Sequence, residues 1–116
     1  MSDKPNSAIL EELYKVIESR RGADPEVSHT AKLFKQGKGK IAKKTGEEAV
    51  EVIVAALHQT PEKVVRESAD LLYHLLVLWA EQGVRPKDVF AELENRLGVS
   101  GIEEKKFRRK KNKPTS

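Results

Sequence analysis

Hydrophobic residues recur at intervals of three and four along most of the chain, the spacing that places side chains on one face of a helix. The first run of this kind predicts a helix that begins behind an N-cap at Asn6 or Ser7 and ends near Gly22. Its apolar positions are Ile9, Leu10, Leu13, Val16 and Ile17. The stretch 22–25 that follows is predicted to be a loop, because it contains glycine and proline.

The middle of the chain predicts two further helices. Ser28 is a suitable N-cap for a short helix that Gly37 ends, and a longer helix is expected from about Lys40 to Leu57. The short helix has little apolar surface of its own, so its simplest role is packing. Glycine at positions 37 and 39 permits a close turn before the longer helix begins.

Thr60 and Pro61 mark the start of another helix, since threonine caps well and proline is tolerated at the first helical position. This helix is expected to continue to Gln82, where Gly83 can end it. A last amphipathic helix is predicted to end at Gly98. Because no segment alternates apolar and polar residues long enough to form a strand, the predicted fold is all-α, a bundle of four to five helices.

The helix expected after Thr60 is hydrophobic almost all round in its second half, which is typical of a helix buried on several sides. The apolar run comprises Leu71, Leu72, Tyr73, Leu75, Leu76, Val77, Leu78 and Trp79. A domain this small offers few helices to cover such a surface, so part of the burial is expected from a second subunit. The bundle is therefore predicted to be completed by dimerisation, with a homodimer as the assembly.

The 116 residues fit one small domain, which we expect to span residues 1–106, followed by a basic and flexible tail at 107–116. The formal charge is +4, and residues 103–113 contain seven Lys or Arg and two Glu, so the basicity belongs to this end. With no cysteine, no signal-peptide pattern and no apolar run long enough to span a bilayer, a cytoplasmic protein without membrane association is expected.

Acidic residues interrupt two of the apolar runs, which makes them the leading functional candidates. At about 100° per residue, Glu47, Glu51 and Glu48 fall within one arc of roughly 100°, and Lys40 and Lys44 lie on the same arc. Such a face can hold metal and phosphate together. The alternative from spacing alone is an amphipathic helix whose acidic face is solvated.

A second acidic group lies on the helix after Thr60. Glu67, Asp70 and His74 share an arc of about 60°, and an antiparallel pairing of the two helices would bring Glu67 and Asp70 opposite the first group. Five carboxylates at close range repel one another, and divalent ions that prefer oxygen ligands relieve that repulsion. The pattern therefore predicts a site for Mg²⁺, with Mn²⁺ as the alternative ion, and phosphoanhydride hydrolysis as its chemistry.

Two longer motifs resemble one family. Residues 40–51, Lys-Ile-Ala-Lys-Lys-Thr-Gly-Glu-Glu-Ala-Val-Glu, and residues 67–78, Glu-Ser-Ala-Asp-Leu-Leu-Tyr-His-Leu-Leu-Val-Leu, are similar to phosphoribosyl-ATP pyrophosphatase of histidine biosynthesis. That family belongs to the all-α nucleotide pyrophosphatases with Glu-Glu-x-x-Glu and Glu-x-x-Asp motifs. The resemblance extends over about residues 7–106, and it implies Mg²⁺-dependent hydrolysis of phosphoribosyl-ATP to phosphoribosyl-AMP and pyrophosphate by a homodimer.

The resemblance also implies roles for individual residues. Glu48, Glu51, Glu67 and Asp70 are expected to bind the metal, with Glu47 as a further ligand or as the base that orients the attacking water. Glu47, Glu48 and Glu51 are thus the predicted catalytic carboxylates. The residues expected to contact the nucleotide substrate are Lys40, Lys43, Lys44, His74, Ser28, Thr30, Lys32 and Arg96. Several of these residues also have a structural alternative: an N-cap for Ser28, a core histidine for His74, a salt bridge or a solvated charge for Lys40, Lys43 and Lys44, and a favourable charge at its helix C-terminus for Arg96.

Two other functions fit parts of the sequence. A housecleaning pyrophosphatase acting on dUTP, dCTP or aberrant nucleotides would use the same acidic motifs. A helical binding module could use the basic tail to hold nucleic acid, with an affinity that falls steeply with salt. The tail is more basic than a pyrophosphatase needs, but the acidic motifs favour an enzyme, so nucleic acid is not the expected partner.

Overall fold

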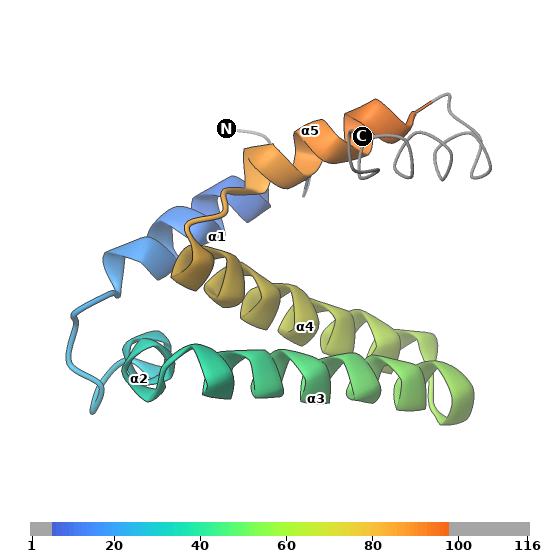
Figure 1. Ribbon diagram of the computed structural model, residues 1–116. Coiled ribbons are helices and arrows are strands. Elements are labelled where there is room, and N and C mark those ends of the chain that lie inside the picture. The colour runs from blue at the N-terminus through green and yellow to red at the C-terminus, as the bar shows by residue number, and fades with distance from the viewer. Residues whose placement is uncertain (1–5, 98–116) are drawn as a thin grey trace, which may run out of the picture. The chain divides into compact units, whose positions relative to one another are not determined.

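The computed structural model describes residues 6–97, and within that range it contains five helices and no strand (Figure 1). The helices are α1 (Ala8–Ser19), α2 (His29–Gln36), α3 (Lys38–His58), α4 (Pro61–Gln82) and α5 (Pro86–Arg96). The all-α prediction is therefore confirmed. None of these described helices is long and apolar enough to cross a membrane.

The chain divides into two compact units, Met1–Pro86 and Lys87–Ser116. The first unit holds α1 to α4, and α5 begins at the boundary. Three predictions fall outside the described residues: the helix end at Gly98, the domain boundary after residue 106, and the basic tail at 107–116. The site discussed below lies in the first unit.

The predicted caps of α2 and α4 are present. The Ser28 hydroxyl accepts a hydrogen bond from the Ala31 backbone N–H at 3.1 Å, and Thr60 accepts one from Lys63 N–H at 3.2 Å. Each cap satisfies a backbone N–H that has no partner inside its helix. Gly83 closes α4 with φ of 73°, a left-handed conformation that favours glycine.

Two helix boundaries differ from the prediction. α3 begins at Lys38 instead of about Lys40, because Gly37, with φ of 93°, both ends α2 and turns the chain directly into α3. The second glycine, at position 39, is accommodated within the first turn. α1 ends at Ser19, before Gly22, and the Ser19 hydroxyl donates a hydrogen bond to the Val16 carbonyl at 2.6 Å. That bond occupies a carbonyl at the helix end.

The longest helices, α3 and α4, lie side by side as an antiparallel hairpin joined by Gln59 and Thr60 (Figure 1). α1 packs against α4, and α2 contacts both α3 and α4. The buried core takes residues from all four helices: Ile17, Leu33, Ile41, Leu76, Val77 and Ala80. On the hairpin these are early positions of α3 and late positions of α4, so the core fills the half where α1 and α2 pack.

The other half of the hairpin has almost no core. Ala55 is its one buried apolar residue within the described chain, while large apolar side chains face outward. On α3 these form the open stripe, which we define as Val50, Ile53, Val54 and Leu57, each between 37% and 71% exposed. Their spacing of three and four places them on one helical face, and Val65 and Leu72 of α4 are exposed as well.

Arg21 joins the first two helices to α4. Its guanidinium lies over the Phe34 ring at 4.3 Å from the centroid and donates a hydrogen bond to the Ala80 carbonyl at 2.8 Å. It also forms ion pairs with Glu18 at 3.3 Å and with Glu81 at 3.7 Å. One side chain thus contacts α2 and α4 from the turn that follows α1.

Candidate metal centre

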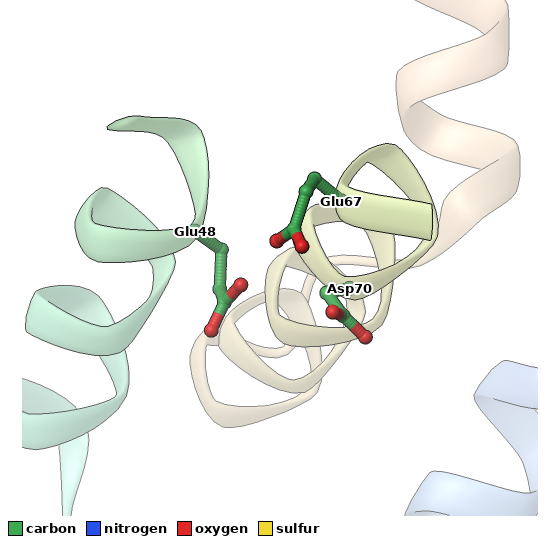
Figure 2. Close-up of side chains that lie close together, drawn as sticks. All are labelled: Glu48, Glu67 and Asp70. Atoms are coloured by element: carbon green, nitrogen blue, oxygen red, sulfur yellow. The ribbon is translucent and has the colours of Figure 1, made fainter. Parts of the chain in front are cut away.

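Three carboxylates meet where the filled and open halves of the hairpin join. Glu48 of α3 and Glu67 and Asp70 of α4 each offer an oxygen, and these oxygens all lie within 4.8 Å of one another. Figure 2 shows Glu48 extending from α3 toward α4 and Glu67 pointing back across the space between the two helices. The two acidic motifs therefore do meet, and Glu48 is the residue of the first motif that belongs to the group.

The position of Glu48 follows from the packing of α3. Ile41 and Ala55, seven residues before and after Glu48, are buried at 0% and 1% exposure. A spacing of seven is two helical turns, so these three side chains lie on nearly the same face. Ile41 and Ala55 fix that face against α4, and Glu48 must then point into the seam.

Glu47 and Glu51 lie outside the group of three. Both are exposed, and relative to Glu48 they are rotated about the helix axis by roughly 100° and 60°. Glu47 forms an ion pair with Lys44 at 3.9 Å. Their roles as ligand or base stay predictions, with Glu51 the nearer of the two in helical rotation.

A basic residue that the sequence analysis did not single out contacts the site. Lys63 Nζ lies 3.7 Å from Glu67, whose side chain is only 14% exposed. The two residues are four apart, a spacing that makes them neighbours on one helical face. This spacing could have predicted the ion pair from the sequence. Lys63 offsets part of the repulsion among the three carboxylates, because it places a positive charge beside one of them.

A ring cluster adjoins the acids on α4. His74 is 8% exposed, and its Nδ1 donates a hydrogen bond to the Asp70 carbonyl at 2.8 Å. The rings of Tyr73 and His74 meet edge to face with centroids 5.2 Å apart. Thr30, also 8% exposed, is hydrogen-bonded through its hydroxyl to that of Tyr73. These contacts hold α2 against the turn of α4 that follows Asp70.

The other predicted substrate residues are spread over α2, α3 and α5. Ser28 caps the N-terminus of α2, the structural role predicted as the alternative to substrate binding. Lys32, Lys40 and Lys43 are exposed, and Lys44 is half-buried beside Glu47. Arg96 of α5 pairs with Glu92 at 3.3 Å within its own helix. Of the predicted substrate residues, His74 bonds the backbone carbonyl of Asp70 and Thr30 bonds the Tyr73 hydroxyl, and the substrate-binding roles of all eight stay predictions.

Comparisons with known proteins add to these observations. The family model described as phosphoribosyl-ATP pyrophosphohydrolase matches residues 10–97. A phosphoribosyl-ATP pyrophosphatase of Paramagnetospirillum magneticum is 64% identical over 106 residues, which cover 91% of this chain and 97% of that protein. Proteins of the same name from Rhodospirillum rubrum and Azospirillum brasilense are 59% and 51% identical, covering 95% and 92% of this chain and 94% and 96% of their own.

Proposed function

Because the chain belongs to the phosphoribosyl-ATP pyrophosphohydrolase family, we propose that it hydrolyses phosphoribosyl-ATP to phosphoribosyl-AMP and pyrophosphate. The family resemblance drawn from the two acidic motifs is thereby confirmed. We place the reaction in histidine biosynthesis and in the cytoplasm, where this cysteine-free chain suits a reducing environment. The observation that carries the proposal is the cluster of Glu48, Glu67 and Asp70 in a chain matched along most of its length.

The chemistry of the cluster fits Mg²⁺, with Mn²⁺ as the alternative. Metal–oxygen bonds of about 2.1 Å put two oxygens on one such ion at most roughly 4.2 Å apart. The observed limit of 4.8 Å is slightly wider, so small side-chain rotations would bring Glu48, Glu67 and Asp70 to that geometry. Bound there, Mg²⁺ would supply charge neutralisation and activation of a water molecule.

The chain's own residues then divide the remaining work. A water oxygen forms a bond to one phosphorus of the α–β phosphoanhydride, the bond from that phosphorus to the bridging oxygen breaks, and a water proton passes to a carboxylate. Glu47 and Glu51 lie within one helical turn of Glu48 and are the carboxylates left to accept it. Lys40, Lys43 and Lys44 precede them on α3 and offset the charge that develops on pyrophosphate.

We also propose that the enzyme acts as a homodimer, in which a second copy covers the open stripe. Four large apolar side chains exposed on one face of α3 are typical of a surface that another chain buries. The stripe follows Glu48 along the same helix. Covering it would remove water from one side of the acid cluster and strengthen the electrostatic interactions there.

Turnover of defined nucleotides tests the assignment. The purified protein should convert phosphoribosyl-ATP to phosphoribosyl-AMP and pyrophosphate with Mg²⁺, followed by chromatography and pyrophosphate release. A parallel panel of ATP, dUTP and dCTP should be cleaved far more slowly. If phosphoribosyl-ATP were inert while dUTP or dCTP was cleaved, the chain would be a housecleaning pyrophosphatase and the proposal would be wrong.

A further inference from the structure

A second polar site lies beside the start of α2. The segment 25–36 lines a cavity of about 640 Å³, outside the acid cluster. Its lining includes Ser28, His29, Lys32 and Lys35. None of these four belongs to the group of carboxylates that could hold a metal ion.

The charge of this cavity favours an anion. Lys32 and Lys35 have no carboxylate partner among residues 6–97, and both are exposed. Glu26 is the one carboxylate in the wall, so two positive charges face one negative charge. A divalent cation has too few oxygen ligands here, whereas a phosphate can accept hydrogen bonds from both lysines.

Ring contacts connect this cavity to the acid cluster. His29, in the cavity wall, stacks on Tyr73 with centroids 6.5 Å apart and meets His74 edge to face at 6.2 Å. Tyr73 follows Asp70 by three residues on α4, a spacing that puts their Cβ atoms roughly 5–6 Å apart. The wall of the cavity is therefore in contact, through the His29 ring, with the turn of α4 that follows Asp70.

We propose that this cavity binds the phosphomonoester of the substrate's phosphoribosyl group, an inference that rests on the proposed function. Phosphoribosyl-ATP carries anions at two ends, a triphosphate and a single phosphate on the second ribose. Three carboxylates repel any phosphate that arrives without a divalent ion, so the acid cluster suits the metal-bound triphosphate. Lys32 and Lys35 hold the other end directly, and this contact distinguishes the substrate from ordinary nucleoside triphosphates.

Direct binding of ribose 5-phosphate tests the cavity apart from catalysis. Calorimetry in EDTA should detect binding to the full chain and a loss of more than tenfold in affinity in the Lys32→Gln/Lys35→Gln variant, because each lysine–phosphate contact contributes about tenfold. Lys15→Gln removes an exposed lysine of α1 outside the cavity and serves as the matched control. Glu26→Gln removes the opposing charge and should tighten binding.

Steady-state kinetics test the link to the substrate. The double lysine variant should show a KM for phosphoribosyl-ATP raised at least about tenfold, a larger effect than on kcat, whereas Lys15→Gln should match the wild type. A KM unchanged in the double variant would overturn the inference while the proposed function stands. A wild type that leaves phosphoribosyl-ATP intact would instead overturn the proposed function.

The measurement of ribose 5-phosphate binding tests the cavity whatever the kinetic result. Absence of ribose 5-phosphate binding, or equal binding by the wild type and the double lysine variant, would exclude a phosphomonoester site. If pyrophosphate bound more tightly than ribose 5-phosphate and was lost in the same variant, the cavity would be a product site and the assignment would be wrong. Circular dichroism should be used to check that each variant keeps its helices.

Discussion

The side-chain hydroxyls of Thr30 and Tyr73 are hydrogen-bonded to each other, and this bond ties α2 to α4 one helical turn beyond Asp70. Thr30 is 8% exposed, so its hydroxyl cannot simply exchange this partner for water. Position 30 was expected to contact substrate, and the structure gives its hydroxyl an internal partner.

A double-mutant cycle measures this bond. Tyr73→Phe and Thr30→Val should each lower the free energy of unfolding by about 1 kcal/mol, and the double variant should lose less than the sum because both changes remove the same interaction. Urea denaturation provides the values. As the control, Tyr14→Phe removes a separate hydrogen bond, to the Val84 carbonyl at 2.8 Å, and its effect should add to that of Thr30→Val.

Neutralising one acid of the cluster should separate activity from stability. Glu48→Gln and Asp70→Asn are each expected to reduce Mg²⁺-dependent turnover at least about 100-fold, because each removes a charged oxygen ligand. Without metal, both variants should melt a few degrees above the wild type, since one repulsion is gone. In differential scanning fluorimetry, Mg²⁺ should raise the Tm of both variants less than it raises the Tm of the wild type.

Glu12→Gln on α1 is the matched control, because Glu12 is exposed and lies outside the cluster. It should leave turnover and the metal-induced rise unchanged. Adding EDTA to the wild type should abolish turnover, and excess Mg²⁺ should restore it. Turnover near normal in both cluster variants would contradict the metal-site proposal.

Arg21 should prove more important for stability than its exposed position suggests. Arg21→Lys keeps the charge but loses the planar group over Phe34 and the geometry of the bond to the Ala80 carbonyl, so we expect a loss of about 1–2 kcal/mol. The same change at Arg20, an exposed neighbour, should cost less than about 0.5 kcal/mol. Equal effects at the two positions in chemical denaturation would show that the Arg21 contacts contribute little.

The open stripe gives a test of assembly. Ile53→Glu places a charge where we propose that a second copy packs, and it should convert the dimer to a monomer and lower activity. Ile9→Glu is a matched control, because Ile9 is also isoleucine on a helix and, like Ile53, is 56% exposed. Light scattering reports the mass of each variant. A monomeric wild type would contradict the dimer, and dissociation by both changes would place the contact elsewhere.

The sequence predicted helix ends best where one residue determines the local geometry. Ser28, Thr60 and Gly83 act through their own hydroxyls or backbone angles, and all three lie at the predicted boundaries. The start of α3 was less predictable, because both Gly37 and Gly39 could have formed the turn. Of these two glycines, only Gly37 adopts a positive φ.

Helical spacing placed Glu47, Glu48 and Glu51 on one arc but could not say how α3 is rotated against α4, and of the three only Glu48 lies in the group with Glu67 and Asp70. Val50 and Ile53 are large apolar residues of a type usually found in a core, yet both are exposed in the single chain. The face that packs is set by Ile41 and Ala55 and carries Glu48 between them. The sequence does show Glu48 seven residues from both Ile41 and Ala55. This spacing alone does not identify the packed face, because several larger apolar residues lie elsewhere on the same helix.

If a second copy covers the open stripe, as proposed, the half-filled hairpin would couple dimerisation to Mg²⁺ binding. Glu48 shares α3 with the open stripe, so a partner that orders this half of the helix also orders one carboxylate of the metal site. By thermodynamic reciprocity, any factor by which dimerisation tightens Mg²⁺ binding is the factor by which Mg²⁺ tightens the dimer. Apparent metal affinity would then rise with protein concentration, and dilution alone would weaken the site without any change in its residues.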